Sequence, residues 1–272
     1  MMALPGTSSQ GADLGATLRS LRGMVAGADA TPALSEGNGL GFGLPALDRM
    51  LGGGLARAAL HEIAPAAVNH LGAAAGFTLA LAARAEEPGK EMLWIQSDFA
   101  AIEAGDPYGP GLACLGLAAE RLVFLRVPRA IDALWAMEEA LRCRAMAAVF
   151  AELTEDGAVA DLTATRRLTL AAREGGGLGL LLRHRTPPQP SAAMTRWEVS
   201  SVPGAGDRFG GLGRTAFALS LLKNRRGPLG RWTLAWDHHE RAFVSAALSL
   251  GVAAPARDRS YRTLVARRAL PG

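Results

Sequence analysis

The residues that could handle phosphate lie between Gly43 and Thr78, on both sides of a short apolar run. In a phosphate-binding loop, the backbone N–H groups of a glycine-rich turn and one lysine hold the phosphates, and a serine or threonine binds Mg²⁺. Here no lysine or arginine occurs between Arg57 and Arg84, and Thr78 is the only hydroxyl residue in that interval. The sequence therefore predicts the frame of a nucleotide site without its phosphate chemistry, and no bound cofactor. The residues of this degenerate loop are Ala66, Gly72, Gly76, Phe77 and Thr78.

Positive side chains, nearly all of them arginine, gather in three segments. The first flanks a proline-rich stretch at residues 183–190, the second is a turn that begins at Lys223, and the third is the tail from residue 257. Arginine binds phosphate and carboxylate groups, so DNA or an acidic partner surface is a candidate ligand. The simpler alternative is a set of solvated loops, and the net charge of +4 permits nucleic-acid contact without requiring it. The candidate contacts are Arg183, Arg185, Arg196, Lys223, Arg225, Arg226, Arg257, Arg259, Arg262, Arg267 and Arg268.

The sequence does not indicate a metal site, a hydrolase site or a membrane span. The histidines lack metal-ligand spacing, and no serine lies in a nucleophile-elbow pattern. His61 falls inside an apolar run, which predicts a buried imidazole with satisfied hydrogen bonds. The longest apolar stretch, Leu71–Ala83, is too short to span a membrane, and two isolated cysteines suit a reducing compartment. We therefore expect a soluble cytoplasmic protein without a metal or a membrane partner.

The elements that would position these residues recur with a regular spacing. Short apolar runs start roughly every thirty residues, which is the length of a βαβ unit. These runs are Leu60–Ile63, Met92–Ile95, Leu122–Leu125, Ala147–Phe150 and Leu178–Leu182. Helical patterns lie between them at Thr78–Ala85 and Ile131–Arg144, and the second would place Ile131, Leu134, Trp135 and Leu141 on one face. The pattern predicts an α/β fold with a mostly parallel, twisted sheet flanked by helices.

The chain divides into three predicted parts. Residues 1–40 contain a short amphipathic helix, Leu14–Val25, followed by a linker that carries glycine, serine and proline. Residues 41–248 form the core domain, and residues 249–272 form a basic tail. Within the core, Ala216–Leu222 and Arg231–Trp236 predict an antiparallel hairpin at the far edge of the sheet.

Several of these motifs, taken in order, resemble the RecA-family core. Gly43–Asp48 and Gly52–Leu55, just ahead of the first core strand, are similar to the start of that core. Lys223–Pro228 is similar to the late hairpin of RadA-type proteins, and the segments Leu115–Leu117, Arg121–Phe124 and Ile131–Arg144 follow the order of the middle of the core. The resemblance spans roughly residues 36 to 245 and implies a RecA-like core.

The departures from that family concern its nucleotide-handling positions. The phosphate-binding loop is replaced by an alanine-rich stretch without lysine. Glu152 stands where the resemblance implies a metal-associated aspartate, and Gln96 to Asp98 stand where it implies a catalytic glutamate. Arg183 stands where it implies a sensor glutamine. Four such changes together are hard to reconcile with ATP hydrolysis, so we expect a protein that is not an enzyme.

A small RecA-like protein with an abolished phosphate loop, rich in alanine and arginine, resembles the ImuA family of bacterial mutagenesis cassettes. Residues 232–240 add to the resemblance. It implies a DNA-damage-induced accessory role in the SOS response and translesion synthesis. The implied partners are RecA and ImuB, an inactive Y-family-like polymerase homologue, with an error-prone replicative-type polymerase subunit as an indirect partner. Weak direct contact with DNA is a further expectation.

Two alternatives stay open at this stage. A cell-division inhibitor of the SulA type also has a RecA-like frame without ATP chemistry and binds the division GTPase, although such proteins are generally shorter. A true ATPase of the RecA, RadA or KaiC type could hold phosphates with backbone amides at a helix N-terminus. Efficient turnover would still lack the positioned charge on which phosphoryl transfer depends. Filamentation of cells on overexpression would favour the first alternative, and thermal stabilisation by ATP would favour the second.

Overall fold

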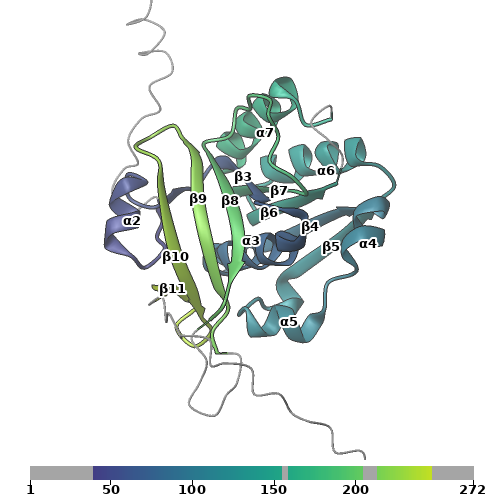
Figure 1. Ribbon diagram of the computed structural model, residues 1–272. Helices are drawn as coiled ribbons and strands as arrows, with labels where there is room; N and C mark the ends of the chain where they lie inside the picture. Colours follow the sequence, from purple (N-terminus) through teal and green to yellow (C-terminus); the bar gives the residue numbers. More distant parts are fainter. Residues whose placement is uncertain (1–38, 155–158, 205–212, 247–272) are drawn as a thin grey trace, which may run out of the picture.

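The five apolar runs predicted as strands lie, together with a sixth strand that was not predicted, β8 (Thr195–Val202), in the parallel part of one nine-stranded sheet (Figure 1). The computed structural model describes residues 39–154, 159–204 and 213–246. The parallel strands are β3 (Ala59–Pro65), β4 (Glu91–Ser97), β5 (Leu122–Val127), β6 (Met146–Leu153), β7 (Leu178–Arg183) and β8 (Thr195–Val202). The sheet order β11-β10-β9-β8-β3-β7-β6-β4-β5 places β3 in the middle and β5 at one edge. The runs of β3, β6 and β7 are buried along nearly their whole length, as expected for parallel strands covered on both faces.

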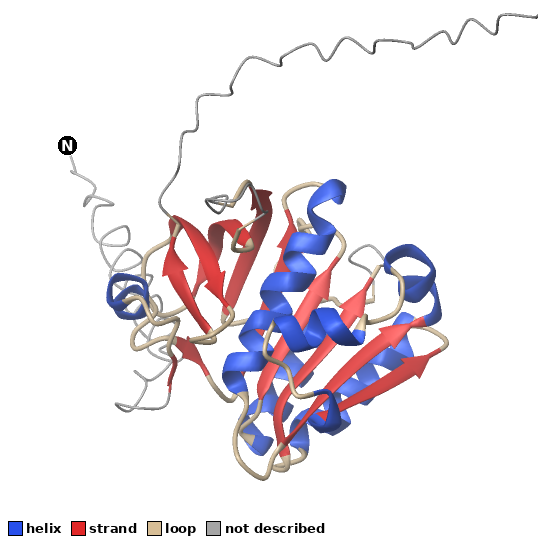
Figure 2. Ribbon diagram, turned by 90° about the horizontal axis from the view of Figure 1, so that it is seen from below, coloured by secondary structure: helices blue, strands red, loops and turns tan. Residues whose placement is uncertain are grey.

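Helices cover both faces of this sheet (Figure 2). Helix α3 (Leu71–Ala85) packs on β3, β6, β7 and β8 within one apolar cluster. Helices α6 (Ala130–Arg142) and α7 (Leu162–Gly175) pack side by side within a second cluster on the other face. The Asp161 carboxylate accepts a hydrogen bond from the Ala164 N–H and begins α7, and Gly176 ends it in the left-handed conformation. The predicted α/β fold, a mostly parallel sheet flanked by helices, is confirmed.

The buried face of α6 differs from the predicted one. Leu134 and Leu141 are buried as expected, whereas Ile131 is 50% exposed and Trp135 is 63% exposed. The buried set instead contains Ala130, Ala133 and Met137. The prediction for Ile131 and Trp135 was therefore wrong, and two large apolar side chains remain at the surface.

The C-terminal part of the sheet is antiparallel, as predicted. Strands β9 (Ala216–Asn224) and β10 (Gly230–Asp237) form the expected hairpin, and β9 also pairs with β8. The outermost strand is β11 (Ala242–Ser245), which pairs with β10 and was not predicted, because a four-residue strand carries too little periodicity. The hairpin therefore lies next to the edge of the sheet rather than at the edge itself.

An aromatic cluster joins the antiparallel strands to α3. The Phe77 ring from α3 lies 5.9 Å from the Trp197 ring and 5.9 Å from the Phe217 ring, measured between centroids. Phe42 and Phe243 complete the cluster, and all five side chains are fully buried. Phe77, which the sequence placed in the degenerate phosphate loop, is therefore a core residue.

The glycine-rich segment ahead of the sheet forms a small capping unit. Strands β1 (Gly39–Leu40) and β2 (Leu55–Ala56) pair with each other around the helix α2 (Pro45–Met50). Gly54 has a φ of +105°, and a Cβ atom there would lie 2.7 Å from the Leu40 carbonyl oxygen, so only glycine fits. The side-chain amide of Asn224, at the start of the β9–β10 turn, donates to the Met50 carbonyl over 3.3 Å. Two motifs that are far apart in the sequence thus meet in space.

Several predictions fall outside the described residues. These are the helix at residues 14–25, the division of the chain at residue 248, and the tail arginines Arg257, Arg259, Arg262, Arg267 and Arg268, while the division at residue 40 stays a prediction. Among the helices that are described, none has both the length and the apolar character needed to cross a membrane.

Candidate functional site

The loop that replaces the phosphate-binding loop connects β3 to α3 at the carboxyl edge of the sheet. The Ala66 N–H, the first of this loop, donates to the Val199 carbonyl of β8 over 2.9 Å. The Thr78 hydroxyl is buried and donates to the Ala74 carbonyl over 2.8 Å within α3. Gly72 and Gly76 lie in the first turns of α3. The Thr78 hydroxyl is therefore turned into its own helix and is not placed to bind Mg²⁺.

Side chains at the ends of three parallel strands bond to one another. Gln96, at the end of β4, donates to the Glu152 carboxylate at the end of β6 over 3.0 Å. The same carboxylate contacts the His184 imidazole, just after β7, over 2.9 Å. Gln96 and Glu152 are almost completely buried. Asp98 is exposed at the start of α4 (Asp98–Ala104), so Gln96 and not Asp98 faces these strand ends.

A cavity of about 780 Å³ opens beside these strand ends. The first turns of α3 form one wall, and residues 103–112, from the end of α4 into α5 (Gly109–Cys114), form another. Trp94, Gln96, Glu152 and His184 also line it. Within the described residues, no group of three histidine, cysteine or acidic side chains is placed to bind a metal ion.

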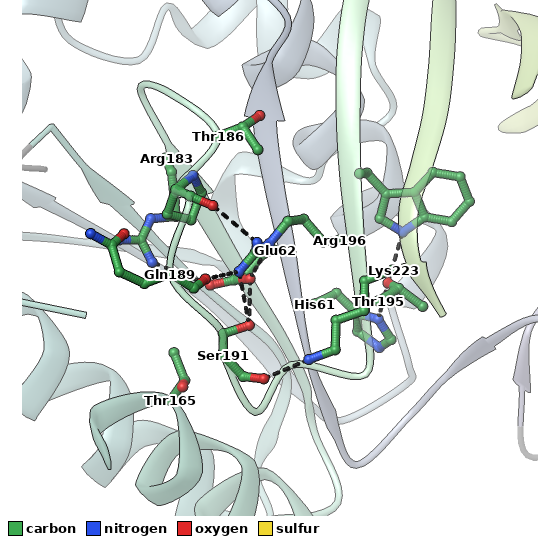
Figure 3. A network of polar contacts seen from close by, with 12 residues as sticks. His61, Glu62, Thr165, Arg183, Thr186, Gln189, Ser191, Thr195, Arg196 and Lys223 are labelled. Carbon is green, nitrogen blue, oxygen red and sulfur yellow. Dashed lines mark hydrogen bonds and ion pairs between the residues drawn. The ribbon is translucent and has the colours of Figure 1, made fainter. Parts of the chain in front are cut away.

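The predicted contact residues Arg183 and Arg196 do not face solvent but converge on one buried carboxylate. Glu62 of β3 is 1% exposed and lies between them (Figure 3). Its two carboxylate oxygens lie 3.2 Å from Arg183 Nη1 and 2.8 Å from Arg196 Nε. The Ser191 hydroxyl donates to the same carboxylate over 2.7 Å. Arg183 itself is only 3% exposed, so in this fold it serves the interior rather than a ligand at the surface.

This network also holds the proline-rich segment that follows β7. Arg196 donates to the carbonyls of Pro187 and Gln189, over 3.0 and 3.1 Å. Lys223 of β9 donates to the Ser191 carbonyl over 2.5 Å (Figure 3). Burial of the Lys223 ammonium group is the main cause of its lowered pKa. Arg196 and Lys223 are therefore used to fix a loop, and Glu62, the common partner of Arg183 and Arg196, was missed. A glutamate inside an apolar strand was the available signal.

His61 is fully buried, and its ring is satisfied as predicted. Nδ1 lies 2.7 Å from the Thr195 hydroxyl oxygen, and Nε2 lies 2.8 Å from the Ala56 carbonyl oxygen. The pKa of this imidazole is lowered from 6.5 to about 4, mainly by burial and to a smaller extent by nearby Arg226, while the hydrogen bond with the Ala56 carbonyl acts in the opposite direction. The neutral ring is the form that the folded protein stabilises.

We expect this histidine to make the protein less stable as pH falls from 6.5 towards 4. In that window the unfolded chain binds a proton at His61 and the folded chain does not, so the free energy of unfolding falls with decreasing pH. One proton corresponds to a slope of at most about 1.4 kcal/mol per pH unit. Urea unfolding of the wild type and of His61→Gln between pH 4 and 8 measures this slope. Equal slopes in the two proteins would contradict the expectation.

The remaining predicted contact residues lie on opposite edges of the sheet. Arg185 is exposed at the carboxyl edge and lines the cavity. Arg225 and Arg226 lie in the β9–β10 turn, which is at the amino edge because β9 runs antiparallel to β8. The Arg225 side chain is exposed, whereas Arg226 is partly buried and burial lowers the pKa of its guanidinium. The described basic residues therefore do not form one continuous DNA-binding surface.

The sequence is similar to that of two curated proteins. No protein-family model matches the chain. Two curated proteins named Protein ImuA, from the Caulobacter vibrioides strains NA1000 / CB15N and ATCC 19089 / CB 15, are each 32% identical to it over 252 residues. The matches cover 85% of this chain and 96% of each relative. The chain belongs to the ImuA family.

Proposed function

We propose that the protein is a non-catalytic accessory factor in DNA-damage-induced translesion mutagenesis, which acts through contacts with RecA and an ImuB-type polymerase homologue. Membership of the ImuA family supports the mutagenesis role. The observation that carries the non-catalytic part is the site at the carboxyl edge. The segment between Arg57 and Arg84 has no lysine, its Thr78 hydroxyl is bonded within α3, and Glu152 bonds to both Gln96 and His184. Phosphoryl transfer requires positioned positive charge, and this arrangement does not supply it.

An exposed apolar edge supports the proposal that the protein works by binding other proteins. Strand β5 lies at the edge of the sheet, and within the described residues no further strand pairs with its outer side. Val123, Phe124 and Leu125 of this strand are 49%, 40% and 36% exposed. Ile131 and Trp135 of α6, which packs beside β5, are also exposed. An apolar edge strand is a site at which a partner can add a strand of its own.

Pull-down of purified RecA by the tagged full-length protein, with and without single-stranded DNA and ATP, tests the proposal. We expect Val123→Glu/Leu125→Glu to reduce the retained RecA about tenfold or more, because two charges would be buried against the partner. Leu170→Glu, at an exposed apolar residue of α7, is the matched control and should retain RecA normally. The same series is run with the ImuB-type homologue.

A second variant distinguishes β5 from the β9–β10 turn as the surface that contacts RecA. Arg225→Glu/Arg226→Glu reverses the charge of the β9–β10 turn at the opposite edge of the sheet. Loss of RecA in this variant alone would assign the contact to the turn instead of β5. Absence of RecA from the wild-type pull-down under every condition would remove RecA as a direct partner.

A further inference from the structure

A second concave site, which we call the arginine pocket, lies at the C-terminal end of α3. The degenerate loop lies at the other end of this 15-residue helix, about 22 Å away. The pocket has a volume of about 440 Å³ and is lined by Ala83, Arg84, Glu86, Pro88, Arg121 and Arg241. Three positive charges against one negative charge leave its lining with a net charge of +2. The pocket therefore attracts anions.

The three arginines come from separate segments, and backbone carbonyls orient them. Arg84, near the end of α3, donates to the Arg241 carbonyl over 2.6 Å. Arg121, at the end of the turn η2 (Ala119–Arg121), donates to the Glu87 carbonyl over 2.9 Å. Arg241, between β10 and β11, donates to the Ala83 carbonyl over 3.0 Å. These bonds fix the guanidinium groups but supply no negative charge to balance them.

The carboxylate of the pocket compensates the arginines only in part. Glu86 pairs with Arg241 and lies 3.8 Å from Arg121. Arg84 bonds to carbonyls alone and forms no ion pair within the described part of the chain. Burial is the main cause of the lowered pKa of Arg84, and nearby Asp48 acts in the opposite direction. Arg84 therefore carries the least compensated charge of the three.

The pocket also has hydrogen-bond donors that a ligand can reach. Among the described residues, Arg84 Nη2, Arg121 Nε and Arg241 Nη1 have no hydrogen-bond partner. None of these three nitrogens is among the fully buried polar atoms without a partner, so each one remains accessible. Each arginine of the lining can therefore donate to a bound anion.

The backbone is specialised to hold Arg241 at this place. Arg241 has a φ of +48°, in the left-handed region that residues other than glycine rarely adopt. Gly116 faces it with a φ of +85°, and a Cβ atom there would lie 2.8 Å from Arg241 Nε. Strained backbone of this kind gathers at ligand-binding sites. It is therefore an observation independent of charge that points to a ligand near Arg241.

We propose that the arginine pocket binds a compact anion that carries two or more phosphate groups. A phosphate group presents three acceptor oxygens in different directions, which suits guanidinium groups that come from three segments. A planar carboxylate is matched by a single guanidinium fork. None of the six lining residues is aromatic or a large aliphatic residue, so the pocket offers no contact to a base or an acyl chain. This site goes beyond the proposed function and is separate from the degenerate loop.

Isothermal titration calorimetry of the full-length chain with inorganic pyrophosphate tests the proposal, and citrate is the carboxylate control. We expect pyrophosphate to bind at low salt with a dissociation constant below about 1 mM. Citrate should bind about tenfold more weakly or not at all. Absence of pyrophosphate binding in this range, or equal affinity for citrate, would overturn the inference.

Three variants locate the binding without breaking the bonds of the arginines. Pro88 is exposed on the lining, and Pro88→Glu should weaken pyrophosphate binding about tenfold or more, because it adds a like charge. Pro88→Gln is the neutral control and should keep the affinity within about twofold. A Cβ atom at Gly72 meets nothing within 4 Å, so Gly72→Glu adds the same charge at the start of α3 and should leave the affinity unchanged.

The pattern across these variants decides the location of the site. An equal loss in Pro88→Glu and Pro88→Gln would show that the added charge is not the cause and would contradict the site. A loss in Gly72→Glu instead of Pro88→Glu would place pyrophosphate at the degenerate loop and overturn the inference. None of these outcomes depends on whether RecA is retained in the pull-down.

Discussion

Glu62→Gln is expected to destabilise the protein by about 3–5 kcal/mol, since it leaves two arginines near a neutral amide. Arg183 is 3% exposed, and Arg196 is held against the proline-rich segment by its bonds to the Pro187 and Gln189 carbonyls, so neither guanidinium is free to turn to solvent. The amide of the variant also places an N–H₂ group where the carboxylate accepted hydrogen bonds from Arg196 and Ser191. Urea unfolding measured by circular dichroism gives the change in the free energy of unfolding.

The matched control is the same substitution on a neighbouring strand. Glu198 of β8 is partly exposed and has one long contact, 3.5 Å from the Thr186 hydroxyl. Glu198→Gln should change the free energy of unfolding by no more than about 0.5 kcal/mol. An effect of Glu62→Gln as small as that would show that the two arginines find other partners.

A double variant tests whether the cost comes from the unpaired arginine. Arg183→Met removes one of the two charges that face Glu62. In Glu62→Gln/Arg183→Met the loss should be smaller than the sum of the two single losses, with a coupling of about 1–3 kcal/mol. Additive losses would mean that the Glu62–Arg183 pair does not act as a unit.

This network also marks the limit of what the sequence could predict about the site. Glu62 is separated from Arg183 by 121 residues and from Arg196 by 134. Arginines after a core strand look alike in sequence whether they bind a ligand or a carboxylate inside the protein. The partner that decides between these outcomes is brought near only by the pairing of β3 with β7 and β8. Arg183 was therefore predicted to be a surface contact, whereas its side chain is buried.

The fold was more predictable because its signals are local. Each parallel strand from β3 to β7 is an apolar run of a few residues, and each can be recognised without knowledge of its neighbours. The absence of lysine and arginine between Arg57 and Arg84, with Thr78 as the one hydroxyl residue of that interval, is also visible in the sequence. The exposed face of α6 was not visible, since Trp135 and Ile131 have the helical spacing of core residues although they face solvent. The cavity was not visible either, because it is lined by side chains from several separate segments.

Gly175→Ala is expected to destabilise the protein by about 3 kcal/mol, at the upper end of what overpacking costs. A Cβ atom at Gly175, the last residue of α7, would lie 2.0 Å from the Leu141 carbonyl oxygen and 2.9 Å from that of Arg142. Both oxygens belong to the backbone at the end of α6, so a side chain there requires one helix to move away from the other. The gain in helix propensity, about 1 kcal/mol, is too small to offset this.

The matched control makes the same change where there is room. Gly76 lies inside α3, and a Cβ atom there would be 3.6 Å from the nearest atom of Phe217, an ordinary contact. Gly76→Ala should therefore stabilise the protein by about 0.5–1 kcal/mol, because alanine loses less backbone freedom on folding. Opposite signs in the two urea unfolding curves would show that the close approach of α6 and α7, and not helix propensity, decides the outcome at Gly175. Stabilisation by both substitutions would contradict the close approach of these helices.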